Sequence, residues 1–286
     1  MKYNFYIKVK NILLIEMEMN IKKASFFLID TDGVILKGEK IIEGTQKALS
    51  LLKDSGAKIM IATNNSTRSR KQLLNFFKKH GIDLKIENIL TSGYCAAQYI
   101  LSKNYKEIYV IGEKGLFEEI RNTGVKIIDE NSEKCDAVII GMDKKINYKK
   151  LVTAHKLIKN GADFIATNAD ATLPLENGDV PGAGALISFL ETSTKVKPII
   201  LGKPNLYFLE IALSLANESK EKCGIIGDRP ETDILMARKA GCLGILVLSG
   251  VSTSKRIEDY PEECRPHLIY SNLLEFAEYY SKKDFD

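Results

Sequence analysis

Two aspartates spaced two residues apart, Asp30 and Asp32, follow an apolar run at 26–29. Four apolar residues in a row are typical of a central parallel strand that is buried on both faces. Ligands of open α/β sheets bind beyond the carboxyl ends of such strands, so both carboxylates are expected where chemistry can occur. Gly33 lets the chain turn there without steric cost. Taken alone, the segment also fits a solvated strand-end turn.

Three further predicted strands, at 57–62, 198–201 and 223–226, are also followed by polar residues. Because the carboxyl ends of parallel strands lie at one edge of a sheet, we expect these polar residues to meet the two aspartates there. Each motif singly also fits a helix cap or a loop, and their joint occurrence favours a site. The polar residues concerned are Thr63, Asn64, Asn65, Lys203, Asp228 and Asp233.

The expected cluster favours phosphate chemistry. Asp30, Asp32 and Asp228 would raise one another's pKa if they lay together without a counter-charge. A hard divalent cation removes that repulsion, and oxygen ligands favour Mg²⁺. Lys203 supplies positive charge and Thr63 a hydroxyl, while amides near helix N-termini attract anions. A carboxylate in such a site can attack phosphorus and form an aspartyl-phosphate.

The elements that must position these residues alternate along the chain from residue 24 onward. Short apolar runs alternate with amphipathic helices, which predicts a parallel sheet with right-handed crossovers. The expected first strands are 26–30, 57–62 and 89–92, and the expected last ones are 198–201, 223–226 and 244–248. A second series of strands is expected at 108–112, 126–128, 137–141 and 164–167, followed by a turn-rich segment at 170–184.

The distance along the chain from Thr63 to Lys203 is far too long for one crossover. It predicts an α/β domain inserted at 104–197 into a Rossmann-like parallel-sheet core of residues 23–103 and 198–286. Residues 1–22 are expected to be a peripheral extension or to precede the natural start, with an N-terminal strand on the sheet as the alternative.

The bulk composition excludes several classes of protein. The 286 residues carry a formal net charge of only +4, which predicts no nucleic-acid partner. The sequence contains no run of 18 apolar residues, so no membrane span is predicted. Five scattered cysteines without a C-x-x-C pair are typical of reduced thiols, and we expect a cytoplasmic protein. The three histidines lie far apart, so zinc bound by histidines is not expected.

The motifs together resemble the haloacid dehalogenase superfamily, and within it the type IIA branch of 4-nitrophenylphosphatase or NagD-like proteins. The likeness covers about residues 25–255 and implies that the inserted domain is a cap of the C2 type. The stretches that carry it are 30–34, 62–68, 167–170, 181–185, 202–204 and 227–233.

The resemblance implies a role for each matching residue. Asp30 would be the nucleophile, and Asp32 would protonate the leaving alcohol and then activate water. Thr63, Asn64 and Asn65 would bind or shape the phosphate site.

Further roles concern the metal and the substrate. Lys203 would stabilise the nucleophile and the transferring phosphate. Mg²⁺ would be held by Asp30, Asp228 and the main-chain carbonyl of Asp32. Asp233 would hold the water shell of the metal or Lys203. Asn168 and Asp170 would contact the substrate from the cap, although both also fit a polar turn.

The implied function is a Mg²⁺-dependent phosphatase acting on small phosphomonoesters through an aspartyl-phosphate. The implied substrates are sugar phosphates, nucleotides, phosphoglycolate or pyridoxal phosphate, and a homodimer through the cap is a further expectation. One alternative is a catalytically silent protein that binds a phosphorylated metabolite. A dehalogenase is the other, and Asp32 with Asp228 argues against it because that chemistry needs neither a metal nor a second carboxylate. No membrane partner is expected.

Overall fold

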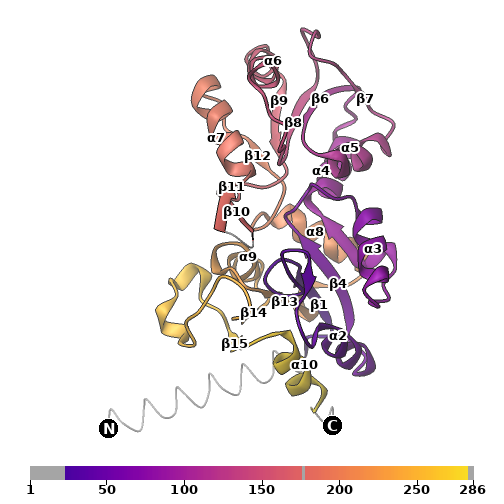
Figure 1. The fold of residues 1–286 in the computed structure, drawn as a ribbon, viewed down its shortest axis with the longest axis vertical. Helices are drawn as coiled ribbons and strands as arrows, with labels where there is room; N and C mark the ends of the chain where they lie inside the picture. Colours follow the sequence, from indigo (N-terminus) through magenta and orange to yellow (C-terminus); the bar gives the residue numbers. More distant parts are fainter. Residues whose placement is uncertain (1–22, 176–177, 283–286) are drawn as a thin grey trace. The chain divides into compact units, whose positions relative to one another are not determined.

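The computed structural model describes residues 23–175 and 178–282 (Figure 1). The extension predicted at 1–22 lies outside the described residues. The chain divides into two compact units, residues 1–61 with 212–286 and residues 62–211. The division falls inside strand β4 (Lys58–Thr63), and β5 (Ile89–Thr91) belongs to the second unit.

The first sheet has the strand order β15-β14-β13-β1-β4-β5. Strand β1 pairs in parallel with β13, and Leu28 lies opposite Ile225. All five residues of each of these two strands are buried, as expected for uninterrupted apolar runs in the centre of a sheet. Besides β4, the strands of this sheet are β1 (Phe26–Asp30), β5 (Ile89–Thr91), β13 (Cys223–Gly227), β14 (Leu243–Val247) and β15 (Leu268–Tyr270).

Two helices of the first unit, α2 (Thr45–Asp54) and α10 (Leu273–Ser281), lie side by side (Figure 1). The Phe27 ring of β1 contacts the Phe276 and Tyr280 rings of α10 edge-on, with centroids 5.2 and 5.0 Å apart. The Tyr280 hydroxyl donates to the Ala24 carbonyl at 2.9 Å. Helix α10 is therefore fastened to β1 and to the residues just before it.

The remaining elements of this unit are short. Strands β2 (Leu36–Lys37) and β3 (Lys40–Ile41) form a hairpin soon after β1. A π-helix at Pro230–Ile234 leads from β13 into helix α9 (Leu235–Ala240). These segments place irregular backbone next to the carboxyl ends of β1 and β13.

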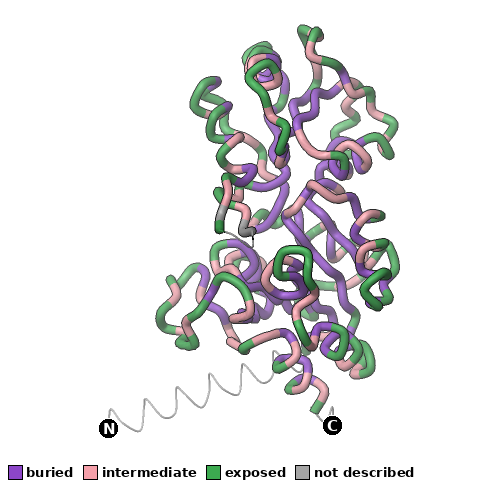
Figure 2. The backbone as a smooth tube through the Cα atoms, viewed as in Figure 1, coloured by how far each residue is buried: buried purple, intermediate pink, exposed green. Residues whose placement is uncertain are grey.

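The second unit contains a parallel sheet of order β12-β9-β8-β6-β7. Its strands are β6 (Glu107–Ile111), β7 (Lys126–Ile127), β8 (Ala137–Ile140), β9 (Asp163–Ala166) and β12 (Ile199–Ile200). Helices α6 (Tyr148–Lys159) and α7 (Ala183–Thr194) pack with this sheet in one apolar core, in which Val138, Leu157 and Leu190 are buried. Figure 2 shows the buried strands running between exposed helix surfaces.

The second unit also contains four further α-helices and a hairpin among its described residues. Helix α5 packs against α3 and α4. The hairpin is antiparallel, with Thr172 opposite Pro181. These elements are α3 (Arg70–Lys79), α4 (Ser92–Lys103), α5 (Lys114–Arg121), α8 (Leu206–Ala216, which extends past residue 211), β10 (Thr172–Leu175) and β11 (Gly178–Pro181). Of the helices in the described part of the chain, none has both the length and the apolar character needed to cross a bilayer.

The structure differs from the prediction at the strand expected at 198–201. That strand was predicted in the first sheet, but β12 pairs with β9 of the second sheet, with Ile200 opposite Ala166. It is also a short edge strand whose Ile199 is 38% exposed, rather than a buried one. The turn-rich segment at 170–184 contains the β10–β11 hairpin. The boundaries predicted for the inserted domain stay a prediction.

Candidate active site

Three buried carboxylates converge in the first unit. Asp30 ends β1, Asp228 directly follows β13, and Asp233 lies in the π-helix after it. One carboxylate oxygen from each residue lies within 4.8 Å of the others. The parallel pairing of β1 with β13 brings Asp30 and Asp228 to the same end of the sheet, as the apolar runs predicted.

The donor set fits a hard divalent cation. Asp228 and Asp233 are each 1% exposed, and carboxylates so deeply buried and so close together need positive charge beside them. Carboxylate oxygens are the ligands that Mg²⁺ prefers. Asp30 and Asp228 are two of the predicted metal ligands. Asp233, predicted to hold the water shell of the metal or Lys203, is the third member of the cluster.

Two glycines make room for the Asp228 carboxylate. A Cβ atom at Gly33 or at Gly250 would overlap the Asp228 carboxylate. Gly33 also has a φ of +83°, which side chains rarely allow. The Val251 N–H donates to Asp228 Oδ2 at 2.7 Å, and Ser252 Oγ donates to the Asp228 carbonyl at 2.6 Å. Asp228 is thus oriented by the loop that follows β14.

Asp32 lies in the turn after β1 and is partly exposed. The carbonyl of Thr31 accepts from Ile35 N at 2.9 Å and from Leu36 N at 2.8 Å, and Gly33 N donates to the Leu36 carbonyl at 2.7 Å. This turn directs the chain into the β2–β3 hairpin. Asp32 was predicted to serve the metal through its main-chain carbonyl and the leaving group through its carboxylate, and both roles stay predictions.

In the second unit, the loop after β4 carries Thr63, Asn64 and Asn65. Thr63 is buried, and its Oγ1 accepts from Asn65 N at 3.0 Å. The side chain of Asn65 accepts from Thr67 N at 2.9 Å and from Thr67 Oγ1 at 2.7 Å. Ser69 then caps α3, with reciprocal hydrogen bonds to Gln72. The loop is therefore held in shape by its own polar side chains.

The same unit brings together four predicted residues from three segments that are far apart in sequence. Asn64 Oδ1 accepts from Lys203 N at 2.8 Å, and Asn64 Nδ2 donates to the Lys203 carbonyl at 3.1 Å. Asn64 Nδ2 also lies 3.2 Å from Asp170 Oδ1. Asn168 Nδ2 donates to the Asn64 carbonyl at 2.7 Å, and Asn168 Oδ1 accepts from Asp170 N at 3.1 Å.

Several residues of these clusters were not predicted. Ser249, Gly250, Val251 and Ser252 surround Gly33 and Asp228, and Ser249 Oγ donates to the Gly33 carbonyl at 2.6 Å. The sequence contained a signal for them, because this serine-containing and glycine-containing loop follows the apolar run at 244–248 just as the other site loops follow their strands. Ser92, whose Oγ donates to the Asn64 carbonyl at 2.5 Å, carried the same signal, because it ends the strand predicted at 89–92.

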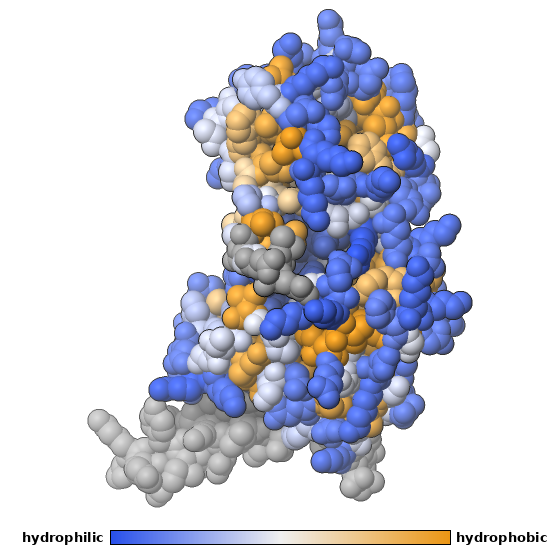
Figure 3. Space-filling model, viewed as in Figure 1, coloured by the Kyte–Doolittle hydropathy of each residue, from blue (hydrophilic) through white to orange (hydrophobic). Residues whose placement is uncertain are grey.

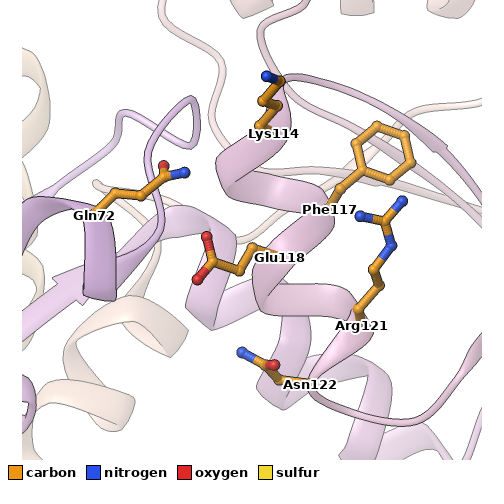
Figure 4. A pocket seen from close by; sticks show the side chains of 6 residues that line it. All are labelled: Gln72, Lys114, Phe117, Glu118, Arg121 and Asn122. Atoms are coloured by element: carbon orange, nitrogen blue, oxygen red, sulfur yellow. The ribbon is translucent and has the colours of Figure 1, made fainter.

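A surface pocket of about 590 Å³ lies between α3 and α5 (Figure 4). The Arg121 guanidinium lies 5.4 Å from the centroid of the Phe117 ring at this pocket, and Glu118 accepts from Ser69 Oγ at 2.9 Å. None of the predicted site residues lines the pocket. Its lining residues are Gln72, Lys114, Phe117, Glu118, Arg121 and Asn122. On the face shown in Figure 3, hydrophilic residues cover most of the surface and separate several hydrophobic patches.

Comparison with known proteins assigns the family. The profile described as Haloacid dehalogenase-like hydrolase matches residues 27–126, and a second, described as HAD-hydrolase-like, matches residues 200–276. Phosphoglycolate phosphatase 1A, chloroplastic, of Arabidopsis thaliana is 33% identical over 279 residues, which cover 90% of this chain and 77% of the relative. The chain belongs to the haloacid dehalogenase-like hydrolase family.

Solved structures define the branch. A p-nitrophenyl phosphatase from Archaeoglobus fulgidus matches with a TM-score of 0.84 and 30% identity, over 90% of this chain and 99% of that one. A glycerol phosphate phosphatase from Mycobacterium tuberculosis, solved in complex with magnesium, matches with a TM-score of 0.82 and 26% identity, over 93% and 78%. The resemblance inferred from the motifs and the predicted fold class, a parallel-sheet α/β core with an α/β cap, are thereby confirmed.

Proposed function

We propose that this chain is a Mg²⁺-dependent phosphatase that hydrolyses small phosphomonoesters through an aspartyl-phosphate on Asp30. The convergence of Asp30, Asp228 and Asp233 to within 4.8 Å is the observation that carries the proposal. The family supports it, because the matched relatives are phosphatases and one of them was solved with magnesium. When bound, Mg²⁺ would neutralise the negative charge of the carboxylates and the phosphoryl oxygens.

In the proposed reaction, an Asp30 oxygen forms a bond to phosphorus as the bond to the leaving alcohol breaks. Asp32 gives its proton to that alcohol and then takes one from the water that attacks the aspartyl-phosphate, which releases phosphate and restores both aspartates. Asp30, Asp228 and the main-chain carbonyl of Asp32 would hold the metal, and Asp233 would hold its water shell or Lys203.

The phosphoryl group would be bound by Thr63 and Lys203. Thr63 Oγ1 accepts from Asn65 N, so its own proton can be donated to a phosphoryl oxygen. Asn65 would contribute to phosphate binding by holding the Thr63 hydroxyl in place through its main-chain N–H. The Lys203 ammonium would offset the charge that develops on the phosphoryl oxygens. Asn168 and Asp170 would place the organic part of the substrate.

The relatives support the proposed substrate class. The names of the matched proteins cite phosphoglycolate, p-nitrophenyl phosphate and glycerol phosphate. We extend the proposal to a small phosphorylated metabolite of the phosphoglycolate, sugar phosphate, nucleotide or pyridoxal phosphate type. A cytoplasmic location and a homodimer through the inserted domain complete the proposal.

The test is release of phosphate from 4-nitrophenyl phosphate and from a panel of phosphorylated metabolites, with and without Mg²⁺. Turnover should require Mg²⁺ and should be abolished in Asp30→Asn. The matched control is Asp54→Asn at the end of α2, where the same change should leave turnover unaltered. Retained activity in Asp30→Asn would refute the nucleophile. A wild-type protein that binds phosphate without turnover would favour the silent binding protein, and release of halide from a 2-haloacid without metal would favour a dehalogenase.

A further inference from the structure

The side-chain amide of Asn64 joins two loops of the second unit. One is the loop after β12, which contains Lys203, and the other is the loop after β9, which contains Asp170. Asn64 is 139 residues from Lys203 and 106 residues from Asp170 along the chain. The sequence motif suggested that Asn64 serves the phosphate, but its side chain has protein partners on both ends.

Those partners use the whole amide. Asn64 Oδ1 accepts from Lys203 N at 2.8 Å, while Nδ2 donates to the Lys203 carbonyl at 3.1 Å. The other Nδ2 proton faces the Asp170 carboxylate, whose oxygens lie 3.2 and 3.3 Å from the nitrogen. An amide has two protons to donate, and both are directed at these partners. The Lys203 N–H and carbonyl also determine the orientation of the Asn64 amide. If Oδ1 and Nδ2 were exchanged, the amide nitrogen would face the Lys203 N–H, and two donors would meet.

The surroundings hold Asn64 in this position. Its carbonyl accepts from Ser92 Oγ at 2.5 Å and from Asn168 Nδ2 at 2.7 Å. A Cβ atom at Gly202 would lie 2.6 Å from Asn64 Oδ1, so the chain can approach this closely only because residue 202 is a glycine. Asn64, Asn168 and Lys203 are all buried. Turning Asn64 toward a ligand would break several buried hydrogen bonds at once.

We propose that Asn64 is a positioning residue that couples Lys203 to Asp170, and that it does not bind phosphate through its side chain. Asn64 clamps both main-chain polar groups of Lys203 and so limits where the ammonium can reach. The same amide ties the β9 loop to that position. A disturbance at Asp170 should therefore change the chemical step as well as substrate binding. The catalytic part of this inference rests on the proposed function.

The first test measures the link without turnover. Asn64→Asp keeps an acceptor for Lys203 N but loses both donated protons and places a carboxylate against Asp170. Hydrogen–deuterium exchange should rise at least threefold in peptides covering both 167–173 and 202–206. The control Asn160→Asp removes the hydrogen bond from Asn160 Nδ2 to the Glu133 carbonyl and should leave both peptides unchanged. An increase in neither peptide, or in only one, would overturn the coupling.

The second test uses turnover of 4-nitrophenyl phosphate. Asn64→Asp should lower kcat at least tenfold and change KM less than threefold, because Lys203 is misplaced while the phosphate contacts remain. Asn64→Asp combined with Asp170→Asn exchanges the amide and the carboxylate. The kcat of this double variant should be at least threefold higher than that of Asn64→Asp alone. A raised KM with unchanged kcat would make Asn64 a phosphate ligand and overturn the proposal. Absence of any recovery in the double variant would do the same.

The two tests distinguish a failure of the proposed function from a failure of the proposed coupling between the two loops. If the wild type has no turnover while the exchange result holds, the proposed function fails and the coupling of the two loops survives. Asp170→Ala, at a partly exposed position, serves if the Asn64 variants do not fold. Its kcat should fall at least threefold because the β9 loop no longer supports Asn64, and an unchanged kcat would contradict the coupling.

Discussion

The Asp228 carboxylate and the Val251 amide are joined by a hydrogen bond of 2.7 Å, donated by the Val251 N–H to Oδ2. The loop after β14 therefore orients a carboxylate that follows β13. The neighbouring Gly250 has no side chain where a Cβ atom would overlap that carboxylate. A small change at position 250 should thus act on the proposed metal site and hardly on the sheet.

Gly250→Ala should lower the affinity for Mg²⁺ by about 10–100-fold, the range expected when the groups that orient a metal ligand are disturbed. Isothermal titration calorimetry with Mg²⁺ measures the effect. The control is Gly93→Ala in α4, where the new Cβ atom would meet its nearest neighbour at an ordinary 3.6 Å. Equal Mg²⁺ affinity in the Gly250 variant and the wild type would show that the space around Asp228 does not matter for the metal.

Asp233 and Asp32 should respond differently to the same substitution. Asp233 is buried in the carboxylate cluster and accepts from Thr232 Oγ1 at 3.0 Å, so Asp233→Asn should weaken Mg²⁺ binding by about 10–100-fold. The Mg²⁺ concentration that gives half-maximal turnover reports this change. Unchanged Mg²⁺ dependence would place Asp233 outside the metal site.

Asp32→Asn should leave Mg²⁺ affinity within threefold, because the proposed metal contact of Asp32 is its main-chain carbonyl. It should lower kcat by about 10²–10⁴-fold, the usual contribution of a general acid and base. Steady-state kinetics combined with calorimetry separates the two effects. A loss of Mg²⁺ affinity as large as that of Asp228→Asn would instead indicate that the Asp32 carboxylate binds the metal.

The hydrogen bond from Tyr280 to the Ala24 carbonyl should stabilise the first unit. Burial raises the pKa of Tyr280, so its hydroxyl stays protonated and able to donate. Tyr280→Phe keeps the ring against Phe27 but removes the donor, and should lower the free energy of unfolding by about 1–3 kcal/mol. Urea unfolding measures the loss. Tyr279→Phe, at a residue that is 41% exposed, should change stability by less than about 0.5 kcal/mol. Equal effects of the two substitutions would contradict this role of the hydrogen bond.

His267 should make the fold sensitive to mild acid. Burial, together with the Arg238 guanidinium beside it, lowers the pKa of His267 below its ordinary 6.5, and His267 Nδ1 faces the Gly244 N–H at 2.9 Å. The unfolded chain therefore binds a proton at a higher pH than the folded one. The contribution of His267 to the free energy of unfolding should be constant above pH 6.5. It should fall as the pH drops from 6.5 through the lowered pKa of the folded state.

His267→Asn tests this pH dependence, because Asn Oδ1 can still accept from Gly244 N but does not titrate. The free energy of unfolding of the variant should vary less than that of the wild type below pH 6.5. The two curves should run parallel at higher pH. Parallel curves throughout the acid range would exclude His267 as the sensitive group.

The carboxylate cluster could be predicted because its cause is local. Uninterrupted apolar runs at 26–29 and 223–226 indicate buried parallel strands, and the residues that follow such strands share one edge of the sheet. The pairing of β1 with β13 confirms this arrangement for Asp30 and Asp228. The roles of these residues in the reaction stay predictions until the variants are measured.

Other features depend on partners that no local pattern names. The apolar residues of β12 fit either sheet, and only its pairing with Ile165 and Ala166 decides between them. Asn64 offers the same amide to a phosphate, a helix end or a distant loop, so its partners 106 and 139 residues away could not be read from its motif. The β10–β11 hairpin was hidden because glycine and proline in that segment also fit an irregular turn.

The membership of β12 in the second sheet has a consequence for shortening the chain. The strand that shortly precedes Lys203 is paired with β9, so a chain without the strands of the second sheet would also lose the support for that lysine. A deletion made to isolate the carboxylates of the first unit should therefore keep Asp30, Asp228 and Asp233 but leave Lys203 without a fixed position.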